Sequence, residues 1–249
     1  MTLKENERLD PVNDNLSLIQ DTEGLTFGTD ALLLAAYIGG GYRTATELGG
    51  GTGIISMLLA TRGKVGRIIC AEVQKEYAEL ISRNIEYNSL GEKIECINAD
   101  VRELRLDECE LVYTNPPYMK TDTGYRNRAA KKNVARHEVF GGIYDFLLAA
   151  RRLLKFGGDF FAVYRPDRMA DLISAMREAG IEPKRMTLVL ADTESEPSML
   201  LVEGRRGGKP GMRLTRPLII YADKSHTAYS RDMEYIMENG SFAEDFRTR

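Results

Sequence analysis

The chain of 249 residues contains no tryptophan, two histidines and three cysteines. His137 and His226 are too few and too isolated to suggest a zinc cluster, so no metal site is expected. Cys70, Cys96 and Cys109 lie far apart, and none belongs to a C-x-x-C pair. Free thiols in a reducing cytosol are the usual explanation for such cysteines, so a cytoplasmic protein without a disulfide framework is expected.

Long apolar runs are also lacking. No segment approaches the roughly 20 apolar residues needed to span a bilayer, so no membrane partner is expected. Residues 1–15 alternate charged and polar side chains, which argues against a secretory signal. The net charge of −3 argues mildly against a nucleic-acid partner, unless basic residues are concentrated locally.

Strand-like and helix-like segments alternate along most of the chain. Strands are expected at 16–20, 44–48, 67–71, 93–98, 111–114, 159–164, 187–190 and 199–202. Helices are expected at 31–37, 54–60, 74–88, 144–154 and 167–179. The alternation predicts an α/β fold in which helices cover both faces of a mostly parallel sheet.

Four of these strands end at residues that could hold a ligand. The glycine-rich segment 49–53 follows the strand at 44–48, and Glu72 follows the strand at 67–71. Asp100 follows the strand at 93–98, and the segment 115–118 follows the strand at 111–114. Since the carboxyl ends of parallel strands meet at one edge of a sheet, these residues are expected to lie together.

The glycine-rich turn and its neighbouring carboxylates predict a nucleoside-bearing cofactor, although such glycines alone can merely let a helix approach the sheet. Glu72 lies about 20 residues beyond the turn, where a carboxylate can accept both hydroxyls of a ribose. Asp100 could accept from the amine of an adenine. Glu47 would attract a cationic amino-acid group and repel a pyrophosphate, which favours S-adenosylmethionine over NAD. The glycines expected to face this cofactor are Gly49, Gly51 and Gly53.

The sequence Asn115-Pro116-Pro117-Tyr118 is typical of a clamp for a planar amino group. The two prolines fix the backbone and remove two N–H donors. The side-chain oxygen of Asn115 and the carbonyl of Pro116 can each accept one hydrogen of an NH2 group. Tyr118 offers a face on which a base can stack, worth about 1–3 kcal/mol. The implied reaction is in-line methyl transfer to an amino nitrogen; the alternative is a rigid turn with a packed tyrosine.

Together, these motifs resemble the class I S-adenosylmethionine-dependent methyltransferases that act on amino nitrogens. The flanking segments resemble the bacterial tRNA(Val) adenine-N6 methyltransferases, which modify the adenine 3′ of the anticodon. These flanking segments are residues 7–10, 19–20, 27–34, 135–138, 207–211 and 217–221. The resemblance implies a Rossmann-like fold with a seven-stranded sheet and N6-methylation of an adenine in tRNA.

By the same resemblance, Phe27, Thr29 and Asp30 would close over the methionine end of the cofactor. Without it, Thr29 or Asp30 would be interpreted only as the N-cap of the next helix. The net charge of −3 does not exclude an RNA partner, because basic residues are concentrated after Tyr118 and again between residues 205 and 216. Such clusters are, however, often only solvated surface. The residues expected to bind the substrate are Pro117, Arg126, Lys131, Lys132, Arg136 and Lys209.

The expected organisation is an N-terminal extension and cofactor lid at 1–40, a methyltransferase domain at 41–222 and a tail at 223–249. A protein glutamine methyltransferase is an alternative, because an amide presents the same planar NH2, but relatives of that type carry a larger N-terminal domain. A DNA adenine methyltransferase is a less favoured alternative, because this sequence leaves little chain for a separate target-reading domain. A non-catalytic module that binds S-adenosylmethionine and RNA is the third alternative.

Overall fold

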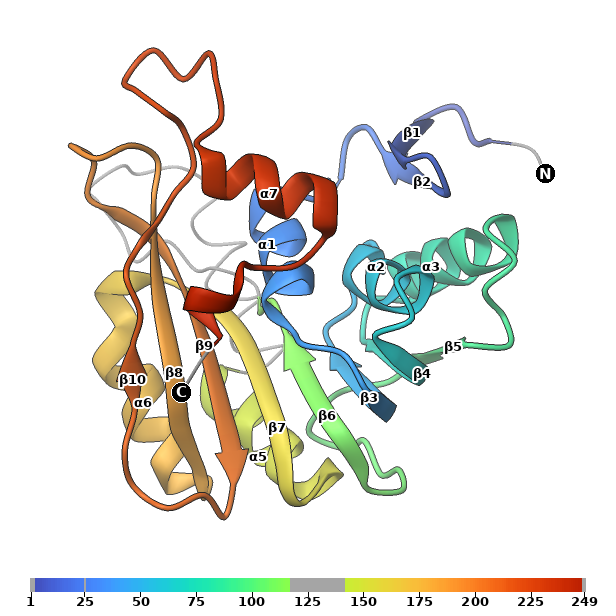
Figure 1. Ribbon diagram of the computed structural model, residues 1–249. Coiled ribbons are helices and arrows are strands. Elements are labelled where there is room, and N and C mark those ends of the chain that lie inside the picture. Colours follow the sequence, from blue (N-terminus) through green and yellow to red (C-terminus); the bar gives the residue numbers. More distant parts are fainter. Residues whose placement is uncertain (1–2, 25, 117–141, 248–249) are drawn as a thin grey trace, which may run out of the picture.

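In the computed structural model, which describes residues 3–24, 26–116 and 142–247, a central sheet carries helices on both faces (Figure 1). The long strands run in the order β8-β9-β7-β6-β3-β4-β5. Strand β9 is antiparallel to both of its neighbours, and the other long strands are parallel. The predicted α/β fold with a mostly parallel sheet is confirmed, but the sheet has nine strands among the described residues, whereas seven were predicted. Two-residue strands, β10 (Arg213–Leu214) and β11 (Leu218–Ile219), are added along β8.

The long strands are β3 (Tyr42–Leu48), β4 (Val65–Glu72), β5 (Ile94–Asn98), β6 (Cys109–Thr114), β7 (Leu154–Tyr164), β8 (Ile181–Leu190) and β9 (Pro197–Arg206). Strands β8 and β9 are much longer than the sequence indicates. The missed part of β8 contains Pro183 and three charged residues, and the register shifts at that proline. Such residues hide the apolar alternation by which a strand is recognised.

Helices α1 (Thr29–Tyr37), α2 (Ile54–Thr61) and α3 (Lys75–Tyr87) share one apolar core on one face of the sheet. Helices α5 (Ile143–Leu153) and α6 (Met169–Glu178) pack in a second core on the other face. Helix α2 is buried along almost its whole length because α1 and β2 contact it besides the sheet. Among the described residues, no helix combines the length and apolar character that crossing a membrane requires.

The N-terminal strands β1 (Glu7–Asn13) and β2 (Leu16–Asp21) form an antiparallel hairpin beside α3 (Figure 1). The Asn84 side chain donates to the carbonyl of Ile19 at 3.0 Å and accepts from its N–H at 2.7 Å. Asn88 makes the same pair of bonds with Ser17, at 2.8 and 3.1 Å. The two asparagines, one helical turn apart, thus satisfy the edge of β2 that β1 leaves open.

The C-terminal segment packs on α1. It contains α7 (Arg231–Asn239), which the sequence did not predict, and a short 3-10 turn at Glu244–Phe246. Another 3-10 turn, at Pro166–Arg168, lies between β7 and α6. The rings of Phe242 and Tyr37 form a T-shaped pair with 5.2 Å between their centres. Residues from the hairpin, from α1 and from this segment all belong to the core that covers α2. The expected extension and tail therefore share one core with the sheet.

Candidate active site

The glycine turn after β3 is fastened to the end of β4. The N–H groups of Gly49 and Gly50 both donate to the carbonyl of Ala71, at 2.9 and 3.1 Å. Gly49, Gly51 and Gly53 have φ angles of +76°, +56° and +78°, which glycine adopts without strain. The turn thus depends on glycine at alternate positions.

The two middle glycines have different roles. A Cβ atom at Gly50 would overlap the sulfur of Cys70 and approach Ile81 at 3.0 Å, so Gly50 lets the turn pack on the sheet. A Cβ atom at Gly51 would meet nothing within 4 Å. The open side of the turn therefore lies at Gly51, where the backbone can face a ligand. The sequence alone did not separate these roles.

Glu72 ties the glycine turn to the start of α3. The side chain is buried, and its two oxygens accept from the N–H groups of Gly51 and Gln74, each at 2.9 Å. Each carboxylate oxygen has a second lone pair, so Glu72 can still accept the hydroxyls of a ribose. The open space at Gly51 and this acceptor fit the nucleoside part of S-adenosylmethionine.

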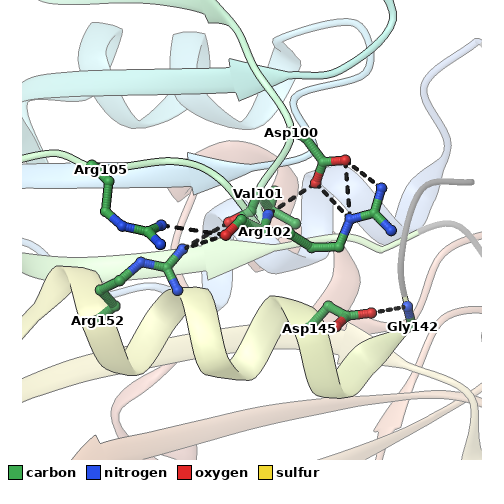
Figure 2. Close-up of polar contacts among 7 residues, drawn as sticks. All are labelled: Asp100, Val101, Arg102, Arg105, Gly142, Asp145 and Arg152. Atoms are coloured by element: carbon green, nitrogen blue, oxygen red, sulfur yellow. Dashed lines mark hydrogen bonds and ion pairs between the residues drawn. The ribbon is translucent and has the colours of Figure 1, made fainter.

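Asp100, after β5, is already engaged by Arg102 (Figure 2). The Arg102 side chain donates to both carboxylate oxygens at distances between 2.5 and 3.0 Å, and its backbone N–H donates at 2.9 Å. These hydrogen bonds hold the pKa of Asp100 below its ordinary value. The amine of an adenine would share this carboxylate with Arg102.

Helix α5 fixes the loop that carries Asp100. Arg152 donates to the carbonyl of Val101 at 2.9 Å (Figure 2). It also donates to the carbonyl of Leu104 at 3.1 Å. The first turn of α5 is closed by a hydrogen bond of 2.9 Å from the Gly142 N–H to Asp145. The loop that carries Asp100 is therefore held by a helix of the second core, to which Val101 and Leu104 also belong.

Asn115 lies immediately after β6. The hydroxyl of Thr114 donates to the carbonyl of Leu48 at 2.7 Å, which brings the ends of β6 and β3 together. The Asn115 Nδ2 atom donates to Asp30 Oδ2 at 2.9 Å, whereas Asn115 Oδ1 is buried and has no hydrogen-bond partner in the described part of the chain. Pro116 is buried. The predicted Pro117, Tyr118, Arg126, Lys131, Lys132 and Arg136 lie outside the described residues.

The segment before α1 reaches the same edge. Gly28 is the N-cap and makes no side-chain cap, so the interpretation of Thr29 or Asp30 as N-cap is wrong. Thr29 is exposed, and Asp30 lies in the first turn against Asn115. The Phe27 N–H donates to the buried Gln20 side chain at 3.0 Å. No sequence pattern signals the contact between Asp30 and Asn115, which are 85 residues apart.

Glu47 is a residue of β3, and its side chain contacts Ser56 of α2. Its carboxylate is fully buried and accepts from the hydroxyl of Ser56 and, at 3.4 Å, from the thiol of Cys70. Ser56 in turn shares a hydrogen bond of 2.7 Å with the hydroxyl of Tyr113. Burial raises the pKa of Glu47 to about 7, and the hydrogen bonds oppose this only in part. Its Oε1 atom has no partner among the described residues.

Lys209 is not brought to this edge. It comes after β9, whose last residues pair with the first residues of β8, at the end of the sheet opposite Asn115. The Lys209 carbonyl accepts from Lys184 at 3.0 Å. Other members of the second basic cluster form ion pairs: Arg205 with Asp159, Arg206 with Glu108, and Arg216 with Asp232 and Asp245.

An open pocket of about 140 Å³ adjoins Asp30. Its other lining residues are Tyr164 and Arg165, at the end of β7, and Ser198 and Met199, at the start of β9. Arg165 pairs with Asp167 at 2.6 Å. Tyr164 and Met199 resemble ordinary strand residues in the sequence, so the pocket could not be anticipated.

The family model described as the methyltransferase small domain matches residues 23–179. The chain belongs to this family. The match spans the glycine turn, Glu72, Asp100 and Asn115, and it confirms the predicted S-adenosylmethionine-dependent methyltransferase.

Curated relatives support the same resemblance. The tRNA1(Val) (adenine(37)-N6)-methyltransferase of Flavobacterium johnsoniae is 25% identical over 185 residues, which cover 72% of this chain and 78% of the relative. The protein of the same name from Porphyromonas gingivalis is 26% identical over 189 residues, covering 72% and 73%.

Solved structures of methyltransferases share the fold. A predicted O-methyltransferase from Agrobacterium tumefaciens superposes with a TM-score of 0.69 at 23% identity, over 86% of this methyltransferase and 98% of that chain. TYW2 of M. jannaschii, solved in complex with AdoMet, superposes with a TM-score of 0.55 at 15% identity, over 82% and 87%. The predicted class I methyltransferase fold is confirmed.

Proposed function

We propose that this methyltransferase transfers a methyl group from S-adenosylmethionine to N6 of an adenine in tRNA. The proposed target is the adenine 3′ of the anticodon of a valine tRNA. The names of the curated relatives support this substrate. The chemistry of the site supports an amino nitrogen as the acceptor of the methyl group.

One observation carries the proposal. Asn115 Oδ1 is a buried acceptor without a partner among the described residues, at the edge of the sheet that also holds the glycine turn and Glu72. A buried polar atom without a partner costs about 1–3 kcal/mol. An incoming N–H donor removes this cost, so the site favours a substrate that presents an NH2 group.

Each residue of the site has its own part in the reaction. Bound S-adenosylmethionine supplies a methyl group on a sulfonium, whose sulfur keeps the bonding electrons when the methyl leaves. Gly51 and Glu72 would hold the nucleoside part of the cofactor. Asn115 Oδ1 accepts one hydrogen of the adenine amine and so turns its lone pair out of the ring plane and lowers the cost of the charge that develops on N6. The new bond to carbon would leave a positive charge on the nitrogen, which would be removed when one proton passes from it to water.

The pocket beside Asp30 is the proposed place for the rest of the target nucleoside. Tyr164 and Met199 supply apolar surface, and Ser198 supplies a hydroxyl. An adenine that reaches this pocket must be unstacked, which single-stranded loops of RNA permit. An anticodon loop meets this requirement.

The test uses radiolabelled S-adenosylmethionine and bulk tRNA that lacks the modification, with subsequent digestion to nucleosides. Label in N6-methyladenosine is the expected result. A parallel reaction contains a release factor in place of tRNA. Label in a glutamine side chain of that protein, with none in RNA, would instead support the protein glutamine methyltransferase.

In the same assay Asn115→Ala is expected to abolish transfer, because it removes the acceptor. Its dissociation constant for S-adenosylmethionine should stay within about threefold of wild type by calorimetry, since Gly51 and Glu72 are intact. Asn239→Ala removes an exposed asparagine at the end of α7 and serves as the matched control with full activity. Full activity of Asn115→Ala would contradict the mechanism.

A further inference from the structure

The Asn115 side chain has two hydrogen-bonding sides, and only one suits an amine. Its oxygen can accept a hydrogen from the substrate, whereas its NH2 group would meet the amine hydrogens with hydrogens of its own. A rotation of the amide by about 180° exchanges the two sides with little change in shape. The reaction proposed above therefore requires that something select one orientation.

Asp30 makes that selection possible. An ionised carboxylate has no hydrogen to donate, so it can pair only with the NH2 side of an amide. The contact of 2.9 Å between Asn115 Nδ2 and Asp30 Oδ2 has this arrangement. The opposite orientation would place two acceptor oxygens against each other. The free side is Oδ1, which is buried and has no partner among the described residues.

We infer that Asp30 is a positioning residue that locks the Asn115 amide with its oxygen toward the substrate amine. This inference rests on the proposed function. It gives Asp30 a role different from the one expected from the sequence, which was contact with the methionine end of the cofactor. Asp30 acts through Asn115 and does not itself hold the reacting nitrogen.

The backbone around Asp30 is arranged for this contact. A Cβ atom at Gly28 would lie 2.7 Å from Asp30 Oδ1, so glycine leaves room for the carboxylate beside the helix start. The preceding residue, Phe27, is held by its hydrogen bond to the buried Gln20 of β2. Asp30 is therefore fixed from the hairpin side as well as by the first turn of α1.

A double-mutant cycle at positions 30 and 115, in which the carboxylate and the amide are exchanged, tests the lock. Asp30→Ala should lower kcat by about 10–100-fold, the range that one hydrogen bond to a charged group is worth. Asp30→Asn should lower it less, by about 2–10-fold, because its amide can pair with Asn115 in either orientation. Asn115→Asp should lose more than about 100-fold at neutral pH, since it sets two carboxylates against each other.

The double variant Asp30→Asn with Asn115→Asp is the decisive one. A carboxylate at position 115 presents an acceptor whichever way it turns, and an amide at position 30 can donate to it. The double variant should therefore be at least about 10-fold more active than Asn115→Asp alone. A double variant no better than Asn115→Asp would overturn the lock and leave Asp30 a structural residue. Glu234→Gln, which removes an exposed first-turn carboxylate from α7, is the control with unchanged kcat.

Two further measurements separate the lock from other roles of Asp30. If Asp30→Ala weakens S-adenosylmethionine binding more than about 10-fold while kcat is kept, Asp30 serves the cofactor and the lock is wrong. The side-chain NH2 signal of Asn115, identified by its loss in Asn115→Ala, should exchange slowly with solvent in wild type and rapidly in Asp30→Ala. This exchange can be measured without RNA. If the wild-type protein transfers no label to adenine, the proposed function is contradicted, but the lock is not. Equal exchange in the two proteins contradicts the lock itself.

Discussion

The buried carboxylate of Glu47 should make the stability of this protein depend on pH. Burial raises the pKa of Glu47 to about 7 in the folded state, from an ordinary value of 4.5. The folded protein therefore holds a proton between pH 4.5 and about 7 that the unfolded chain has lost. Stability from this group is fully present below pH 4.5 and is lost as pH rises through about 7. The difference between the two pKa values corresponds to about 3 kcal/mol at about pH 8.

Replacement of Glu47 by glutamine should remove this dependence. A glutamine keeps an oxygen for the hydroxyl of Ser56 but carries no charge that must be ionised inside the core. In urea unfolding, Glu47→Gln should be close to wild type at about pH 5 and more stable by up to about 3 kcal/mol at about pH 8. Glu76→Gln, an exposed glutamate in the first turn of α3, is the matched control and should run parallel to wild type.

The same pair of proteins tests whether Glu47 serves the cofactor. A cationic group near Glu47 would favour its ionised form, so S-adenosylmethionine should bind wild type more tightly as pH rises from about 6 to about 8. Glu47→Gln should lack this part of the pH dependence. If the free energies of unfolding of wild type and Glu47→Gln differ by the same amount at about pH 5 and about pH 8, the buried, protonatable state of Glu47 is refuted. Equal pH dependence of cofactor binding would refute only its role at the cofactor.

Two further predictions concern the hairpin and the RNA. Asn84→Ala leaves the N–H and carbonyl of the buried Ile19 without the partners that Asn84 provides. It should lower the free energy of unfolding by about 2–4 kcal/mol in urea melts. A loss below about 0.5 kcal/mol would show that other contacts hold the hairpin. Lys131→Ala combined with Lys132→Ala should weaken tRNA binding and reduce the slope of log affinity against log salt by about 2. Lys209→Ala, at the opposite end of the sheet, should change that slope less, and an equal change would place RNA at both ends.

The order of elements and the edge that carries the ligand-holding residues could be predicted from the sequence, because they depend on local patterns. Buried strands that stop at Glu72 or just before Asn115 are recognisable from their apolar runs and from the polar residue at the end of each run. Where charges interrupt a strand, as in β8, the apolar pattern is lost and the strand was predicted too short. Helix α7 was missed although its apolar residues Met233 and Ile236 face the core.

The chemistry within the site was less predictable, since it depends on contacts between segments far apart in the chain. The sequence indicates that Asp100 is a carboxylate at the right edge, but not that Arg102 occupies it. It marks Glu47 as an acid beside the glycines, but whether that side chain turns toward solvent or under α2 is decided by packing. The partner of Asn115 could be identified only once α1 and β6 were placed side by side.

The two halves of the site are held by different parts of the fold, which gives them different sensitivities. The proposed cofactor side is fixed within the sheet, where Glu72 bridges Gly51 and the start of α3. The orientation of Asn115 instead depends on Asp30, whose segment is tied to the hairpin through Gln20. Loosening the hairpin should therefore disturb Asn115 before it disturbs the cofactor. The Asn84→Ala protein, assayed below its melting temperature, should show a lower kcat with an almost unchanged affinity for S-adenosylmethionine, and the reverse pattern would mean that the hairpin supports the cofactor side.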